Sequence, residues 1–104
     1  MKHRISTDYY LQFYGCDQGI HIMVYENSAP LTCKKERLRP MRDFLSQPQG
    51  TAFRGGLILE RESESIAVIA KKNHIGSVPV SVFEKAIEKA ASKQLPYYEP
   101  AGQA

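Results

Sequence analysis

Four segments of the chain alternate apolar residues with other residues at a period of two, which is the pattern of a β-strand whose two faces meet different surroundings. They form two pairs, and a short turn separates the members of each pair. The first pair is YYLQFY and IHIMVYE around the turn at residues 15–19, and the second is GLILERE and SIAVIAKK around Ser63–Ser65. Each pair therefore predicts an antiparallel hairpin.

A third strand is predicted after each hairpin. The first follows a turn at Asn27 and Ser28 and reads APLTCKK. The second follows a turn at Asn73 and His74 and reads IGSVPV, with asparagine supplying the positive φ that such turns often require.

Each set of three strands leads into a predicted helix. The first helix, RPMRDFLSQ, has Pro40 in its first turn, where the missing N–H costs little. The second spans 81–94, has apolar residues along one face, and is long and well capped. Ser81 and Glu84 have the spacing of a capping box, and Pro96 ends the helix.

The two halves of the chain align without a gap when they are shifted by 46 residues. Leu11 is then identical with Leu57, Ile20 with Ile66, and Asn27 with Asn73. So few identities do not establish duplication, but the shared order of elements predicts two βββα units. We therefore expect an α+β domain over residues 1–95, with two helices and one sheet of about six mostly antiparallel strands. Residues 96–104 are expected to form an extended, flexible tail.

Composition sets limits on the class of protein. The 104 residues, 42% of them hydrophobic, suit one globular domain. The net charge of +3 permits binding to nucleic acid without requiring it. The longest purely apolar run, IAVIA, is far shorter than the roughly 20 residues of a membrane span. We expect a cytoplasmic protein that does not bind membranes.

Strand alternation also predicts a binding surface. Two helices can cover only one face of so wide a sheet, and the other face would be too apolar to remain without a partner. This predicted binding surface consists of Tyr10, Tyr14, His21, Met23, Tyr25, Ile58 and Ile69. The partner would be a second copy of the chain, another protein, or unstacked bases lying on the tyrosine rings. The alternative is one helix on each face, which would make these residues ordinary core.

A run of basic residues lies between the two halves, and its members are Lys34, Lys35, Arg37, Arg39 and Arg42. A phosphate site would need several of these cations to converge on one surface. Strand alternation would instead divide them between two faces, as in an ordinary solvated segment. We expect them to rim the binding surface and to steer an acidic partner.

No pattern in the sequence indicates catalysis, a metal or a cofactor. The three histidines are far apart, and Cys16 and Cys33 form no C-x-x-C pair. The alternating carboxylates Glu60, Glu62 and Glu64 suit a charged strand edge better than a cation site, because no Asp or His ligand is near.

These observations predict a binding module without enzymatic activity. The function expected first is self-association, as a homodimer, or binding to another protein through the tyrosine-bearing face. The alternative is binding of single-stranded DNA or RNA by the same face, with the run from Lys34 to Arg42 contacting phosphates.

Overall fold

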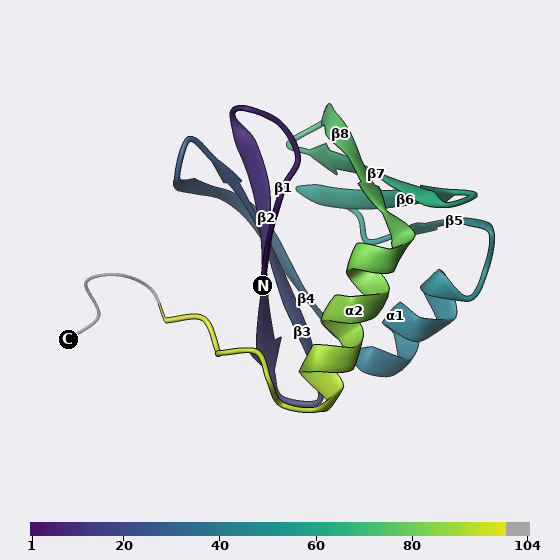
Figure 1. Ribbon diagram of the computed structural model, residues 1–104. Helices are drawn as coiled ribbons and strands as arrows, with labels where there is room; N and C mark the ends of the chain where they lie inside the picture. Colours follow the sequence, from purple (N-terminus) through teal and green to yellow (C-terminus); the bar gives the residue numbers. More distant parts are fainter. Residues whose placement is uncertain (100–104) are drawn as a thin grey trace.

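The computed structural model describes residues 1–99 and has an α+β fold, as the sequence predicts. Eight strands form two antiparallel sheets of four, which we call sheet A (β1-β2-β3-β4) and sheet B (β5-β6-β7-β8). One helix follows each sheet (Figure 1). The elements are β1 Lys2–Arg4, β2 Tyr9–Cys16, β3 Gly19–Glu26, β4 Ala29–Arg37, α1 Leu38–Leu45, β5 Gln49–Ala52, β6 Leu57–Glu62, β7 Ser65–Ala70, β8 Asn73–Pro79 and α2 Val80–Ala91.

The strand count corrects the sequence prediction. One sheet of about six strands was expected from two βββα units, whereas the units are ββββα and each forms its own sheet. The two unpredicted strands, β1 and β5, are short edge strands without apolar alternation, KHR and QGTA. Edge strands bury little side-chain area, so the hydrophobic pattern does not mark them.

The 46-residue shift is reproduced in the pairing of the central strands. Leu11 lies opposite Val24 in sheet A, and the shifted pair Leu57 and Ala70 lie opposite each other in sheet B. The edge strands β1 and β5 do not keep this relation, because Lys2 pairs with Gln12 whereas Gln49 pairs with Glu62. The likeness of the two halves therefore resides in their central hairpins.

Of the two turns predicted around asparagine, one forms at the predicted residues and the other does not. Asn27 and Ser28 both have positive φ, 50° and 72°, and connect β3 to β4 as predicted. The second turn lies two residues earlier than predicted, at Lys71 and Lys72, with φ of 50° and 70°. Asn73 is consequently the first residue of β8, where it pairs with Ala70.

Helix α2 spans Val80–Ala91 rather than 81–94, and the predicted capping box is absent. Its N-cap is Pro79, which makes no side-chain capping bond. The N–H of Val80 instead donates to the carbonyl oxygen of Glu64 at 3.0 Å, so a neighbouring turn satisfies the first helical donor. The helix ends where Lys93 adopts a φ of 56°.

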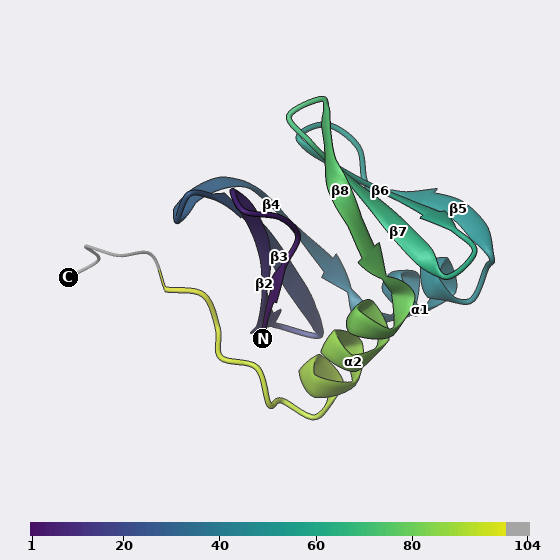
Figure 2. The same cartoon turned by 45° about the horizontal axis from the view of Figure 1, so that its top comes forward.

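Sheet B and both helices lie on the same side of sheet A (Figures 1 and 2). Helix α2 contacts β2, β3 and β8, and α1 contacts β4, β5 and α2. Phe13 of β2 and Phe83 of α2 pack against each other in the core, and their rings meet edge to face with centroids 5.5 Å apart. Neither helix has the length and apolar character needed to cross a membrane within the described residues.

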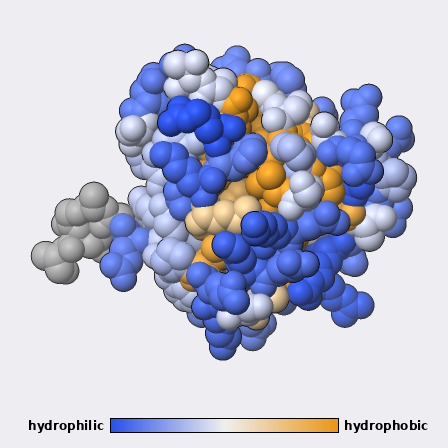
Figure 3. All heavy atoms as spheres, viewed as in Figure 1, coloured by the Kyte–Doolittle hydropathy of each residue, from blue (hydrophilic) through white to orange (hydrophobic). Residues whose placement is uncertain are grey.

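The edge of sheet A meets sheet B at a close contact. Ile5, which follows β1, packs over Gly76 of β8. Gly76 has a φ of 149°, and a Cβ at this position would clash with the Ile5 side chain, so both constraints require glycine. Figure 3 shows apolar side chains reaching the surface along this junction, between β1 and the start of α2. The half-buried side chains that pack against the core include Ile5, Ile75 and Val82.

Replacing Phe13 by alanine tests the packing of sheet A on α2. The Phe13→Ala substitution removes a ring that is 0% exposed, so it should lower the free energy of unfolding by about 3–5 kcal/mol in urea denaturation. The control is Phe53→Ala, since Phe53 is only partly buried at the edge of the core. Equal losses for the two variants would contradict this packing.

Candidate functional site

The candidate site is the outer face of sheet A, which is the face turned away from the helices. Leu11, Phe13, Ile20, Ile22 and Val24 point into the core, so the alternating residues of β2 and β3 point outward. Five residues of the predicted binding surface lie on this outer face: Tyr10, Tyr14, His21, Met23 and Tyr25. Neither helix covers it in the described part of the chain (Figure 2).

Three of these five side chains are nevertheless buried. His21 is 5% exposed, Met23 4% and Tyr25 9%, whereas Tyr10 and Tyr14 are half-buried. The ring of Tyr10 stacks on that of Tyr25 with centroids 4.8 Å apart, and the hydroxyls of Tyr14 and Tyr25 are hydrogen-bonded at 3.1 Å. The accessible aromatic surface is therefore limited to parts of Tyr10 and Tyr14.

The segment after α2 supplies further cover, and we call residues 95–99 the strap. Leu95 is buried in the core, and the carbonyl oxygen of Pro96 accepts a 3.0 Å hydrogen bond from the N–H of Gly15. Tyr97 forms a parallel bridge with Gly15. Residues 96 and 97 thus pair with β2 at Gly15, while residues 100–104 of the predicted tail lie outside the described residues.

Tyr98 of the strap lies against the aromatic side chains of the outer face. Its ring meets Tyr14 at a centroid distance of 5.2 Å and His21 at 5.5 Å, both in edge-to-face contacts. Tyr97 points elsewhere, because it is 56% exposed and its hydroxyl donates to Asp17 Oδ1 at 3.3 Å. The two neighbouring tyrosines therefore have different surroundings.

His21 has an unusual environment for a buried polar side chain. Its Nε2 has no hydrogen-bond partner among the described residues. Burial lowers the pKa of His21, and the positive charge of Lys35 on β4 lowers it further. The imidazole is consequently held in its neutral form at neutral pH.

Cations flank the aromatic side chains on both edge strands of sheet A. On β1, Lys2 Nζ lies 4.2 Å from the centre of the Tyr10 ring and Arg4 Cζ lies 5.9 Å from it. On β4, Lys35 is opposite His21 and Arg37 is opposite Gly19, and both side chains are exposed. The sequence reasoning missed Lys2 and Arg4, although the alternation in Lys-His-Arg could have indicated a strand with two cations on one face.

The basic run is divided, as strand alternation predicts. Lys35 and Arg37 share the outer face, whereas Lys34 points to the other side and lies 5.9 Å from the ring of Phe53. Arg39 and Arg42 belong to α1. Of the five predicted phosphate contacts, Lys35 and Arg37 therefore lie on the same face as the tyrosines.

Ile58 and Ile69 belong to a different surface. They lie directly opposite each other in sheet B, on the face away from its buried residues Leu57, Leu59 and Val68. The structure does not bring them together with the tyrosines of sheet A.

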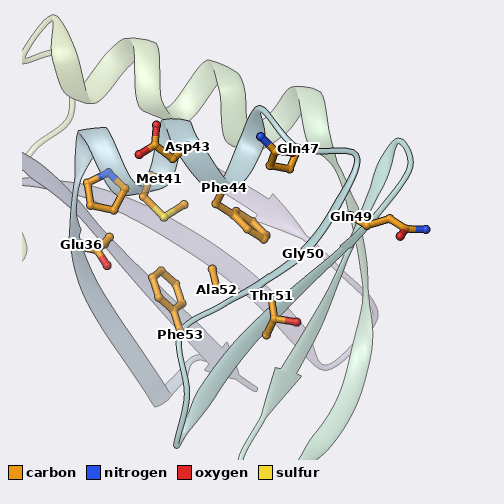
Figure 4. Close-up of a pocket in the computed structure, with 11 residues that line it drawn as sticks. Glu36, Met41, Asp43, Phe44, Gln47, Gln49, Gly50, Thr51, Ala52 and Phe53 are labelled. Carbon is orange, nitrogen blue, oxygen red and sulfur yellow. The ribbon is translucent and has the colours of Figure 1, made fainter.

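The cavities include one between α1 and β5 and one beside sheet A. The first, about 410 Å³, lies between α1 and β5, and the rings of Phe44 and Phe53 point into it (Figure 4). The second, about 480 Å³, adjoins the outer face of sheet A beside the strap. Its lining residues are Cys16, Asp17, Lys35, Glu36, Arg37 and Tyr97.

The described residues contain no cluster of three His, Cys, Asp or Glu side chains that could hold a metal ion. Cys16 and Cys33 are both free thiols, and burial raises the pKa of the Cys16 thiol. A raised pKa disfavours the thiolate and therefore nucleophilic chemistry at this position.

Compared with known proteins, the chain matches no family model, no curated protein and no solved structure.

The buried imidazole predicts a dependence of stability on pH. Because the pKa of His21 is lowered in the folded protein, the unfolded chain takes up a proton first as the pH falls below about 6.5. Acidification from pH 7.5 to 5.5 should therefore lower the melting temperature of the native protein more than that of a His21→Gln variant. Parallel curves for the two proteins would show that His21 does not contribute.

Proposed function

We propose that the protein binds single-stranded DNA or RNA on the outer face of sheet A. The observation that carries this proposal is the order of side chains across the four strands. Lys2 and Arg4 lie on one edge, aromatic rings lie in the centre, and Lys35 and Arg37 lie on the other edge. Single strands are commonly bound by aromatic side chains that stack on bases next to cations that contact phosphates.

The dimensions of the face suit this mode of binding. Strands in a sheet are spaced about 4.8 Å apart, so the two edge strands are roughly 14 Å apart. A strand of nucleic acid that crosses the sheet would place phosphates near both edges and bases over the centre. Tyr10 and Tyr14 are the half-buried rings of this face, and a base that stacks on Tyr10 would replace Lys2 Nζ, which lies over that ring. Stacking contributes about 1–3 kcal/mol per base.

Sheet B provides an internal comparison. In the 46-residue alignment Tyr14 corresponds to Glu60 and His21 corresponds to Ala67. The equivalent face of sheet B thus has a carboxylate and a small apolar side chain in place of the aromatic rings. The same backbone arrangement supports the proposed chemistry in only one half of the chain.

A protein partner on the outer face of sheet A is less favoured. Packing of a second sheet would be driven by newly buried apolar area. His21, Met23 and Tyr25 are already at most 9% exposed, so little apolar area remains there. Cations on both edges would also repel a second copy of the same face.

Self-association through sheet B is the second candidate function. The half-buried residues Ile58, Ala67 and Ile69 lie together on its outer face, and no helix covers them in the described part of the chain (Figure 2). A second copy of the chain could bury the same residues of both subunits around a two-fold axis.

The nucleic-acid proposal predicts a specific effect of charge removal. The Lys35→Gln/Arg37→Gln double variant should bind an unstructured oligonucleotide more weakly than the native protein in fluorescence anisotropy. Each lost phosphate contact lowers the slope of log K against log salt by about 0.7, so the slope should fall in magnitude by about 1.4.

The matched control removes the same net charge from sheet B. Lys71 and Lys72 are exposed in the β7–β8 turn, and the Lys71→Gln/Lys72→Gln variant should keep the native affinity and slope. Equal losses in both double variants would indicate binding to net charge alone and would refute a site on sheet A.

The second candidate predicts a change in oligomeric state. Light scattering after size-exclusion chromatography should find a dimer of the native protein and a monomer of Ile69→Lys. A native protein that is monomeric at every concentration would contradict self-association.

A further inference from the structure

We infer that Tyr98 occupies a nucleobase subsite of the proposed single-strand site, and that the strap competes with the nucleic acid for it. The subsite is formed by Tyr14, His21 and the adjoining cavity with Lys35 and Arg37. This inference rests on the proposed function and adds to it a base-binding position and an intramolecular competitor.

The strap is anchored independently of the Tyr98 ring. Leu95 is 6% exposed in the core, and the backbone of Pro96 and Tyr97 pairs with Gly15 of β2. A Cβ at Gly15 would lie 3.1 Å from both the Leu95 carbonyl oxygen and the Tyr97 ring, so glycine permits this close approach. Tyr98 can therefore leave its position while the start of the strap stays attached.

The contacts of Tyr98 are of the kind that a nucleobase can replace. Its ring meets the ring of Tyr14 at 65° and that of His21 at 89°. Among the hydrogen bonds of the described residues, none involves the Tyr98 hydroxyl. A flat, aromatic base of similar thickness could occupy the same space against Tyr14.

His21 has a ring nitrogen, Nε2, that makes no hydrogen bond to Tyr98 and is available to a base. Its Nε2 is buried without a hydrogen-bond partner, and a buried polar atom left in this state is unfavourable. Nucleobases have N–H and carbonyl groups along their edges, and proteins read single strands through such groups. A base in this subsite would give the His21 nitrogen a partner.

The adjoining cavity of about 480 Å³ provides a place for the phosphate. Lys35 lies opposite His21 across the β3–β4 pair, so the base and phosphate positions are neighbours. Two carboxylates also line this cavity, and each accepts one hydrogen bond. Asp17 accepts a hydrogen bond from Tyr97, and Glu36 accepts one from the backbone N–H of Arg37 at 2.8 Å.

The test is the affinity of the full chain for an unstructured, labelled oligothymidylate. Removing the competing ring with Tyr98→Ala should tighten binding, because apparent affinity scales with the fraction of molecules whose site is open. A strap that is closed nine-tenths of the time predicts a gain of about tenfold. Tyr98→Phe keeps the ring and should bind as the native chain does.

Three further variants separate the possible outcomes. Tyr10→Ala removes a stacking ring that does not touch Tyr98, so it should weaken binding. A chain that ends at Tyr97 should reproduce the gain seen for Tyr98→Ala, and it replaces that variant if Tyr98→Ala does not fold. His21→Phe, combined with Tyr98→Ala, should lose part of the gain because it lacks Nε2.

Unchanged or weaker binding by both Tyr98→Ala and the shortened chain would overturn the inference. The proposed function would survive that result if Lys35→Gln/Arg37→Gln still reduced affinity and Lys71→Gln/Lys72→Gln did not. Absence of binding by the native protein and by every strap variant would refute both proposals.

Discussion

The burial of β3 on both of its faces is the constraint on which the other features of this structure depend. On one face Ile20, Ile22 and Val24 pack in the common core with the helices and sheet B. No second layer covers the other face in the described residues, yet His21, Met23 and Tyr25 of this strand are almost fully buried there. Stacked tyrosines and the strap provide that cover, so the aromatic side chains stabilise the fold as well as form the candidate site.

The two halves show how one backbone arrangement can support different surfaces. Their central hairpins share the same register, with Phe13 opposite Ile22 and Leu59 opposite Val68. Their inward residues are alike because both halves contribute to one core. Their outward residues differ, since Tyr14 of sheet A corresponds to Glu60 of sheet B. The core requires similarity on one face only, which leaves the other face free to acquire cations and aromatic rings.

The sequence predicted those features of the fold that depend on the short-range periodicity of apolar residues. Every second residue of the central strands is apolar because one face of each strand packs in the core, so their hairpins and the common face of Tyr10, Tyr14 and Tyr25 could be inferred. The edge strands β1 and β5 could not be inferred, because they bury little side-chain area. Tertiary contacts account for the other differences: Glu64 satisfies the first N–H of α2, and Tyr98 reaches Tyr14 from a segment far along the chain. Neither contact has a local sequence signal.

Amide and side-chain NMR during titration with an unstructured oligonucleotide tests the central claim most directly, because it reports which sheet the ligand contacts. We predict that shift changes will concentrate at Tyr10, Tyr14, His21 and Lys35, with release of Tyr98 from its neighbours. The corresponding face of sheet B, at Ile58, Ala67 and Ile69, should remain unperturbed. Changes centred on sheet B, or no changes at a saturating concentration of the oligonucleotide, would contradict this account.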